Sequence, residues 1–467
     1  MIQQFINREA ELEALEKAYR EERSALFIIY GRRRIGKTEL VKHFIKNKEN
    51  IYFLADERPD IANIKEIQKS MGEFLRDTIF EKAEINEWVE LFEEFTKRSK
   101  KKTVIVIDEF PYLIHTNKSI PSVFQKIWDN NLSRKDVFLI LLGSSISIME
   151  EHTLSYKSPL YGRRSGQLEL KPLKIRHLFK FFTKYTLEDI IKVWSLTDGI
   201  PLYLMKLDSE KSFMKNLEQN VFKIGKFLYQ ESENLLKQEL REVANYFHIL
   251  KSISFGRNKY GEIVNFTNLD KTIISKYLDN LIKLHLIRKE FPITQKRETR
   301  NASYTFEDNY FNFWFRFVYP NKQLTEEGKQ KIIIENIADE MNAYFSFVFE
   351  KACKEFVWYL DLPIKFNKVG KWWHKDKEID LVCLDELNKE ALFIEIKWSD
   401  LKEKDAERVI DELKMKAEYV DWNNSKRKEY YGVIAKSFSK RPKSDCLLFD
   451  LRDLENACRH YTRRKRR

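Results

Sequence analysis

The sequence contains few cysteines and no long hydrophobic run. Its four cysteines form no C-x-x-C pair and no cluster with histidines, which argues against a zinc site and against a disulfide framework. Apolar stretches such as VFLILLG are much shorter than a membrane span, and the N-terminal MIQQFINREAELEALEKAY lacks the apolar core of a signal peptide. We therefore expect a soluble, cytoplasmic protein that has no membrane partner.

Acidic residues are also in deficit. The chain has 72 Asp and Glu against 84 Lys and Arg, which gives a net charge of +12. Such an excess of positive charge favours a polyanionic partner, above all nucleic acid, although it says nothing about the fold. With 467 residues, 43% of them hydrophobic, the chain is long enough for about three domains, each with its own core.

A phosphate loop is predicted near the N-terminus. In ALFIIYGRRRIGKTELVKHFI an apolar strand leads into the pattern G-x-x-x-x-G-K-T, from Gly31 to Thr38, and an amphipathic helix follows. The two glycines permit the tight backbone path, Lys37 can reach the terminal phosphates, and Thr38 can ligate magnesium. The pattern therefore predicts ATP and Mg²⁺ as cofactors. The residues expected to contact the nucleotide are Gly31, Arg32, Arg33, Arg34, Ile35, Gly36, Lys37, Thr38 and Glu39.

Two acidic residues end the next buried strand. The continuous apolar residues in KKTVIVIDEFPYLI are typical of a strand buried in a parallel sheet, and Asp108 and Glu109 stand at its carboxyl end, where ligands bind. We expect Asp108 to take part in the magnesium shell and Glu109 to orient or deprotonate the attacking water. The alternative is an acidic pair that caps a helix, and the phosphate loop upstream disfavours it.

The first half of the chain resembles the archaeal-type ATPases of the AAA+/STAND group. The segments that carry the resemblance are FINREAELEALEKAY, GRRRIGKTEL, VIVIDEFPYL, SPLYGRRSGQLELKPL and DGIPLYL. It implies that Ser144, at the end of the strand in DVFLILLGSSISIME, senses the terminal phosphate from a strand between the phosphate loop and the two acids. It also implies that Phe5 and Arg8 lie near the adenine.

Two further features of this resemblance have structural alternatives. Arg163 or Arg164 would contact phosphate, in cis or from a neighbouring copy, because the planar arginine fork suits a developing phosphoryl charge. An ordinary basic loop is the alternative for this pair. Pro201 in DGIPLYL would belong to a nucleotide-proximal turn, and the alternative there is a turn that only starts a helix.

Three helices followed by two strands are predicted in the middle of the chain. The helical segments are REVANYFHILKSISFG, YGEIVNFTN and DKTIISKYLDNLIKLHLI, the last capped by Asn268 or Asp270. Two strands, IRKEFPI and ASYTFED, flank a basic turn that contains Lys296, Arg297 and Arg300. This order is typical of a winged helix-turn-helix, whose wing would contact phosphates. The alternative is an interaction module or a lid on the ATPase.

The last third of the sequence resembles the PD-(D/E)xK nuclease superfamily. Glu350 lies on a predicted helix and Asp380 on a strand within GKWWHKDKEIDLVCLD. Glu395 and Lys397 share one face of a second strand, FIEIKWSD. The resemblance implies that Asp380 and Glu395 bind Mg²⁺ at the scissile phosphate, with Lys397 positioning the water. Ile379 replaces the usual proline, and the alternatives are a surface salt bridge or a DNA-binding relic that does not cut.

These observations predict an α/β protein with three parts. Residues 1–235 would form a P-loop ATPase domain with a parallel sheet and a helical lid, residues 236–325 a winged helix-turn-helix, and residues 326–467 a restriction-endonuclease-like α/β domain with a basic tail. The predicted function is ATP hydrolysis coupled to binding of nucleic acid, DNA above all, and to its Mg²⁺-dependent cleavage. The alternative is a STAND-like switch that docks DNA or protein without cutting, and a homo-oligomer or a protein partner stays open.

Overall fold

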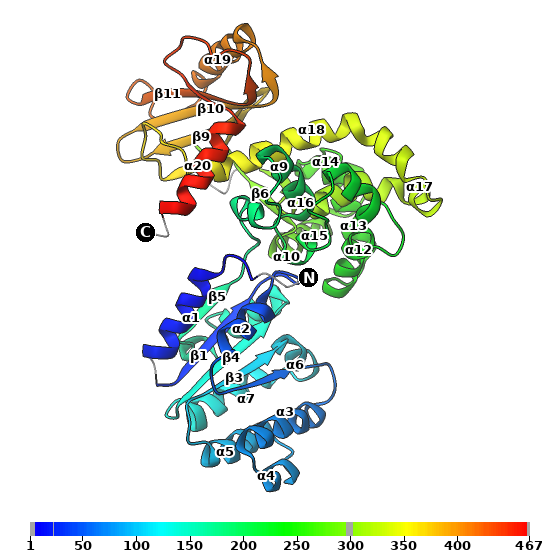
Figure 1. Cartoon of the computed structure of the whole chain (residues 1–467), viewed down its shortest axis with the longest axis vertical. Helices are drawn as coiled ribbons and strands as arrows, with labels where there is room; N and C mark the ends of the chain where they lie inside the picture. Colours follow the sequence, from blue (N-terminus) through cyan, green and yellow to red (C-terminus); the bar gives the residue numbers. More distant parts are fainter. Residues whose placement is uncertain (1–4, 22, 296–301, 465–467) are drawn as a thin grey trace. The chain divides into compact units, whose positions relative to one another are not determined.

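The computed structural model describes residues 5–21, 23–295 and 302–464, with side chains up to Arg459. The protein divides into two compact units, Met1–Pro172 with Ile200–Leu202 and Leu173–Gly199 with Tyr203–Arg467 (Figure 1). Residues 173–199 and 203–235, which we expected in the ATPase domain, belong to the second unit. None of the helices in the described ranges combines the length and the apolar character that a membrane span requires.

A parallel five-stranded sheet forms the centre of the first unit. Its strands are β1 (Ala25–Tyr30), β2 (Asn50–Leu54), β3 (Thr103–Asp108), β4 (Val137–Gly143) and β5 (Gly166–Glu169). They are ordered β2-β3-β4-β1-β5, and every pair is parallel. β1, β3 and β4 are buried at every residue, as expected for strands covered on both faces. The predicted parallel sheet is confirmed, and β4 lies between β3 and β1 as the resemblance implied.

Helices cover both faces of this sheet (Figure 1). Since alternate residues of a strand face opposite sides, β1 supplies Phe27 to one core and Ile28 to the other. Phe27 packs with Leu15 and Leu40 of the first two helices, and Ile28 belongs to the core that contains Ile64 of the third. The helices of this unit are α1 (Glu9–Glu21), α2 (Lys37–Ile45), α3 (Asp60–Leu75), α4 (Thr78–Lys82), α5 (Trp88–Arg98), α6 (Phe110–Thr116), α7 (Ile120–Ile127) and α8 (Ile146–Met149).

The second unit begins with helices and a short strand pair. The helices are α9 (Leu187–Thr197), α11 (Phe213–Asn216), α12 (Phe227–Glu239), α13 (Val243–Ser254), α14 (Tyr260–Thr267), α15 (Lys271–Lys283), α16 (Asn309–Phe313), α17 (Lys322–Glu326) and α18 (Gln330–Phe356). After α13, α14 and α15 come the antiparallel strands β6 (Ile287–Glu290) and β7 (Ser303–Phe306), in the predicted order. Asp270 caps α15, because its carboxylate accepts the Thr272 N–H at 2.8 Å. The residues of the predicted wing that lie outside the described residues are Lys296, Arg297 and Arg300.

A second five-stranded sheet follows α18. Its strands are β8 (Lys368–His374), β9 (Lys377–Asp385), β10 (Glu390–Leu401), β11 (Lys428–Phe438) and β12 (Leu447–Phe449), and its helices are α19 (Glu403–Ala417) and α20 (Leu451–Arg464). The order is β12-β11-β10-β9-β8, antiparallel from β8 to β10 and parallel from β10 to β12. The single strand predicted for GKWWHKDKEIDLVCLD is wrong. Lys375, with φ 54°, lies in a turn that separates β8 from β9.

Candidate nucleotide and metal sites

Two glycines with positive φ shape the loop between β1 and α2. Gly31 has φ 145°, and a Cβ built there would lie 2.5 Å from the carbonyl oxygen of Leu170, so no other residue fits. Gly36 has φ 92° and precedes the first residue of α2, while Arg34 also has a positive φ of 70°. The loop therefore ends at a helix N-terminus, where backbone N–H groups attract anions.

Lys37 lies inside this loop. Its Nζ donates to the carbonyl oxygens of Gly31 at 2.8 Å and of Arg32 at 2.9 Å, and the residue is only 5% exposed. A buried ammonium needs such partners because an unpaired buried charge is costly. The charge is thus held at the loop, where a P-loop nucleotide places its phosphates.

Asp108, at the end of β3, links the start of α2 to β2. Its Oδ2 accepts hydrogen bonds from the Thr38 hydroxyl at 2.7 Å and from the Tyr52 hydroxyl at 2.6 Å. Burial and the bond to Asp108 raise the pKa of Tyr52, so the phenol stays a donor. A hydroxyl and a carboxylate side by side are hard oxygen ligands of the kind that Mg²⁺ prefers, so these residues fit the metal. Tyr52 was not predicted from the sequence.

Glu109 and Ser144 meet at the same edge of the sheet. The Ser144 hydroxyl donates to Glu109 Oε1 at 2.5 Å, and its backbone N–H donates to Oε2 at 3.3 Å. Glu109 has φ 55°, which turns the chain from β3 into α6. The structure therefore brings together the acid and the polar residue that the sequence assigned to water and to the terminal phosphate.

Phe5 and Arg8 lie just before α1. The ring of Phe5 stacks on His43 with centroids 4.4 Å apart. Arg8 is buried and donates to the carbonyl oxygens of Ile35 at 3.2 Å and Lys171 at 2.9 Å. Arg8 thus ties the phosphate loop to the segment after β5, and its predicted place near the adenine stays a prediction.

Arg163 and Arg164 are not brought to the loop in this chain. They precede β5, whose pairing with β1 starts at Phe27, whereas the phosphate loop follows the opposite end of β1. Arg163 pairs with Asp129 at 2.8 Å, and Arg164 donates to a backbone carbonyl at 2.9 Å. The register of β5 therefore disfavours the predicted contact in cis, and contact with a neighbouring copy's nucleotide stays a prediction.

The other predicted nucleotide residues lie around these groups. The guanidinium of Arg33 donates to the Tyr112 hydroxyl at 3.2 Å. Glu39 is exposed in the first turn of α2. Pro201 begins the short helix α10 (Pro201–Leu204), and its place near the nucleotide stays a prediction.

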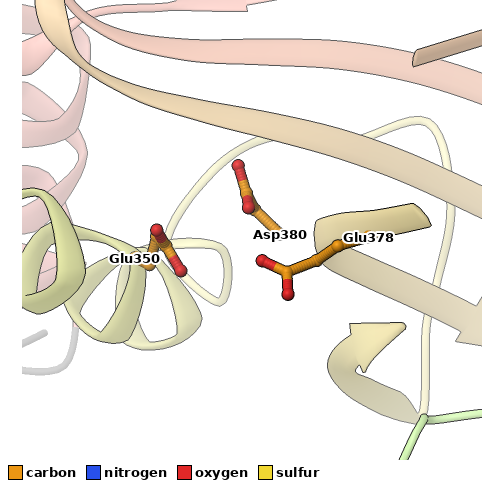
Figure 2. Close-up of side chains that lie close together, drawn as sticks. All are labelled: Glu350, Glu378 and Asp380. Carbon is orange, nitrogen blue, oxygen red and sulfur yellow. The ribbon is translucent and has the colours of Figure 1, made fainter. Parts of the chain in front are cut away.

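A second polar site lies in the C-terminal part of the second unit. Carboxylate oxygens of Glu350 on α18 and of Glu378 and Asp380 on β9 lie within 4.8 Å of one another (Figure 2). Asp380 is 8% exposed, and its Oδ2 accepts the backbone N–H of Ile396 on β10 at 2.8 Å. Glu378 was missed in the sequence, although it stands two residues before Asp380 and so shares its face of the strand.

Glu395 lies on β10, beside this cluster. It is 5% exposed, and its Oε1 accepts hydrogen bonds from Lys397 at 2.8 Å and from Lys416 of α19 at 3.0 Å. Its Oε2 is buried and has no hydrogen-bond partner among the described residues. The ion pair of the salt-bridge alternative is present, but its acid is buried, so it is not a pair confined to the surface.

The acids perturb one another strongly. Burial and the charges of Glu395 and Glu350 raise the pKa of Asp380 to about 7, and burial also raises the pKa of Glu350. Lys371 Nζ lies 3.1 Å from Glu350 Oε2 and 2.5 Å from Glu378 Oε1, and these acids raise the lysine's pKa although burial opposes the shift. The site thus favours a cation, and its buried carboxylates fit Mg²⁺ by their chemistry.

Family models match two segments of the chain. Residues 5–207 match a model described as an ATPase domain predominantly from Archaea, and they include the phosphate loop, Asp108, Glu109 and Ser144. Residues 314–409 match a model described as archaeal and bacterial proteins of unknown function, and they include all the acids of the second site. The N-terminal part is therefore an ATPase domain.

Two proteins of Methanocaldococcus jannaschii extend the similarity to most of the chain. Uncharacterized protein MJECL04 is 39% identical over 453 residues, which cover 96% of this chain and 99% of the relative. Uncharacterized ATP-binding protein MJ1659 is 23% identical over 406 residues. The aligned residues cover 82% of this chain and 97% of the relative. Among solved structures, the Walker-type ATPase PABY2304 of Pyrococcus abyssi matches with a TM-score of 0.50 and 22% identity, over 67% of this chain and 96% of that one. This last likeness shows a shared fold.

Proposed function

The chain belongs to the same family as protein MJECL04 of Methanocaldococcus jannaschii, and from this premise we propose that it is an ATPase that controls the binding and Mg²⁺-dependent cleavage of nucleic acid. The observation that carries the proposal is the convergence of the carboxylates of Glu350, Glu378 and Asp380, with the buried Glu395 close enough to raise the pKa of Asp380. The same chain holds a phosphate loop in which Lys37 donates to the Gly31 carbonyl and Thr38 donates to Asp108, and at the same sheet edge Ser144 donates to Glu109.

We interpret the chain as three functional parts. Residues 1–235 act as the ATPase domain with its lid, residues 236–325 as a winged helix-turn-helix, and residues 326–467 as a restriction-endonuclease-like domain with a basic tail. The order of α13, α14, α15, β6 and β7 supports the second part. The third is supported by acids on a helix and two adjacent strands, together with a lysine two residues after the last acid. The boundary at 235 falls inside α12, within the second compact unit, so we distinguish the first two parts by role and not by packing.

In the ATPase domain each side chain has a definable task. The loop amides and Lys37 would hold the β- and γ-phosphates, and Thr38 with Asp108 would hold Mg²⁺, which neutralises phosphate charge. Glu109 orients a water for attack, and Ser144 fixes the Glu109 carboxylate by its two hydrogen bonds. The hydrogen bond from Thr38 to Asp108 holds the end of β3 next to the phosphate loop.

We expect Glu109→Gln to bind ATP normally but to hydrolyse it at least about 100-fold more slowly, since general-base and water-positioning groups contribute factors of about 10² to 10⁴. ATP affinity should change little because the Thr38–Asp108 contact is untouched. Single-turnover hydrolysis and equilibrium binding of a fluorescent ATP analogue measure the two effects. The exposed Glu73→Gln in α3 is the matched control, and undiminished turnover in Glu109→Gln would assign the water to another group.

In the C-terminal domain the acids and Lys397 have different roles. Asp380, Glu350 and Glu395 would hold Mg²⁺, which stabilises the charge that develops on the scissile phosphate. Lys397 donates to Glu395, and this bond and charge raise the lysine's pKa although burial opposes the shift. The amine is therefore protonated at neutral pH and can contact a phosphate oxygen, while its partner orients it.

We expect DNA binding to be steeply salt-dependent and largely insensitive to sequence. The net charge of +12 favours phosphate contacts, and each neutralised phosphate contributes a slope of about −0.9 to log K against log salt. Fluorescence anisotropy with two unrelated oligonucleotides between 50 and 200 mM salt, a range set as roughly that of counterion-release studies, measures the slope. A flat affinity across this range would favour a protein partner instead.

The second candidate function is a switch that docks DNA or protein without cutting. It is favoured by the ion pairs that already neutralise the acids, with Lys371 on Glu350 and with Lys397 and Lys416 on Glu395. The purified protein on labelled single-stranded and duplex DNA, with Mg²⁺ and with or without ATP, separates the two functions. Products that require Mg²⁺ support the nuclease, and intact DNA under every condition supports the switch.

A further inference from the structure

A pocket of about 390 Å³ opens beside the acid cluster, and two parts of the second unit line it. One wall comes from the segment before α14 and from β6 and β7. The other comes from α18, β8 and β9 and carries the three acids that point toward one another in Figure 2. The residues of the first wall are Asn258, Lys259, Arg288, Glu290, Ser303 and Thr305.

The first wall is firmly joined to the second. The backbone N–H of Ile293, just after β6, donates to the carbonyl oxygen of Lys371 on β8 at 2.9 Å. Lys354 of α18 pairs with Glu290 of β6 at 2.9 Å, and although burial opposes the shift, Lys354 and Arg288 lower the pKa of Glu290 to about 2. The strand pair is therefore part of the acidic site and shapes what can enter it.

Positive charge lies on both walls. The cationic residues of the pocket are Lys259, Arg288, Lys351, Lys354, Lys371, Lys375 and Lys377. Lys259 and Lys375 stand on opposite walls and are exposed, so their ammonium groups can meet a ligand without breaking a buried ion pair. A central acid cluster that suits a metal, flanked by cations, matches a chain of phosphodiesters, since the neighbouring phosphates need counter-charges.

The aromatic residues and the volume of the pocket limit the class of ligand further. Trp373 and Phe347 are partly exposed in the pocket, and proteins that hold single strands combine basic grooves with aromatic side chains on which bases stack. A volume of about 390 Å³ lies in the range of about 300–1,000 Å³ that encloses a small ligand, such as one nucleotide. A space for about one nucleotide suits a strand whose bases are unpaired and can enter it one at a time.

We propose that this pocket binds a single strand of nucleic acid and that β6 and β7 form the wall that guides the strand past the acids. The inference rests on the proposed function and specifies its substrate as single-stranded DNA or RNA, including the unpaired end of a duplex. Lys259 and Lys375 contact phosphates on the two sides of the acid cluster, and Trp373 stacks on a base.

Binding of labelled oligonucleotides tests the proposal. The full chain, in Ca²⁺ to limit cleavage, should bind a 15-nucleotide single strand, chosen as roughly the upper site size of single-strand binders, at least about tenfold more tightly than the same sequence as a blunt duplex. Lys259→Gln with Lys375→Gln should weaken single-strand binding about tenfold and reduce the salt slope by about two. Trp373→Ala should weaken it at least about fivefold. Lys289→Gln is the matched control, because this exposed lysine of β6 lies between two pocket residues but does not line the pocket.

The outcomes separate this inference from the proposed function. Equal or tighter binding of the blunt duplex would overturn the single-strand inference and leave nucleic-acid binding intact. A preference for single strands that survives in the double variant and in Trp373→Ala would overturn this pocket as the binding site. Failure to bind any oligonucleotide, with normal ATP binding, would overturn both the inference and the proposed nucleic-acid function.

Discussion

Replacing Lys37 by alanine should abolish ATP turnover, with a fall of at least about 100-fold, and should strongly weaken nucleotide binding. The Nζ of Lys37 is held by the carbonyl oxygens of Gly31 and Arg32, so its charge is fixed at the loop before a nucleotide arrives. Alanine removes that charge and leaves the phosphates to the backbone N–H groups and the other side chains of the loop. Phosphate release and isothermal titration with ATP measure the two losses.

The control for this prediction is Lys46→Ala, which removes an exposed lysine at the C-terminal end of the same helix. It should hydrolyse ATP at the rate of the unaltered protein. Circular dichroism of Lys37→Ala should show a folded chain, because the side chain contributes no apolar core. ATP affinity unchanged in folded Lys37→Ala would contradict the assignment of Gly31–Thr38 as the phosphate loop.

Asp380→Asn should abolish Mg²⁺-dependent cleavage while ATP hydrolysis continues. The metal supplies several kcal/mol of stabilisation to the developing charge, so losing a carboxylate ligand should slow cleavage at least about 100-fold. ATP hydrolysis should persist because the phosphate loop belongs to the other compact unit. Lys397→Ala should also stop cleavage but leave metal binding measurable, since the amine is no metal ligand.

The same substitution has an expected signature in stability. Because the pKa of Asp380 is about 7 in the folded chain, against about 3.9 for an unperturbed aspartate, the folded state binds more protons between these values. The free energy of unfolding should therefore fall as the pH rises from about 4 to about 7, and Asp380→Asn should flatten this dependence. The Tm of Asp380→Asn at pH 8 should thus equal or exceed that of the unaltered protein, although an ordinary ion-pair partner would lower it.

Asp361→Asn offers a matched control, because this aspartate is exposed between α18 and β8. It should leave both the cleavage rate and the pH dependence of unfolding unchanged. Cleavage that persists in Asp380→Asn, in Glu395→Ala and in Lys397→Ala would eliminate this site as a nuclease centre. A Tm at pH 8 that falls in Asp380→Asn would contradict the raised pKa.

Local sequence was sufficient where one segment sets both the backbone and the chemistry. The strand, loop and helix around Lys37 were predicted because glycine spacing and apolar runs specify them without help from distant residues. The placement of Ser144 came from the family resemblance, and its hydroxyl indeed lies 2.5 Å from Glu109 at the ligand edge of the sheet. The order of α13, α14, α15, β6 and β7 likewise follows from periodicity alone.

Contacts between segments far apart in the chain could not be predicted from the sequence. Lys371 and Glu378 face Glu350 because β8 turns back on β9, and that turn interrupts a stretch that looks like one strand. Lys416 reaches Glu395 from α19, 21 residues later, through the packing of that helix on the sheet. The direction of Arg163 depends on the register of β5 against β1, which no local pattern encodes.

The short segment Ile200–Leu202 belongs to the first unit, although the residues on both sides of it belong to the second. The polypeptide thus changes unit after Pro172, after Gly199 and again after Leu202. A fragment that starts at Tyr203 would lose α9, whose Ser195 carbonyl accepts the Tyr344 hydroxyl of α18 at 2.8 Å. No single proteolytic cut in the chain can therefore release either unit whole.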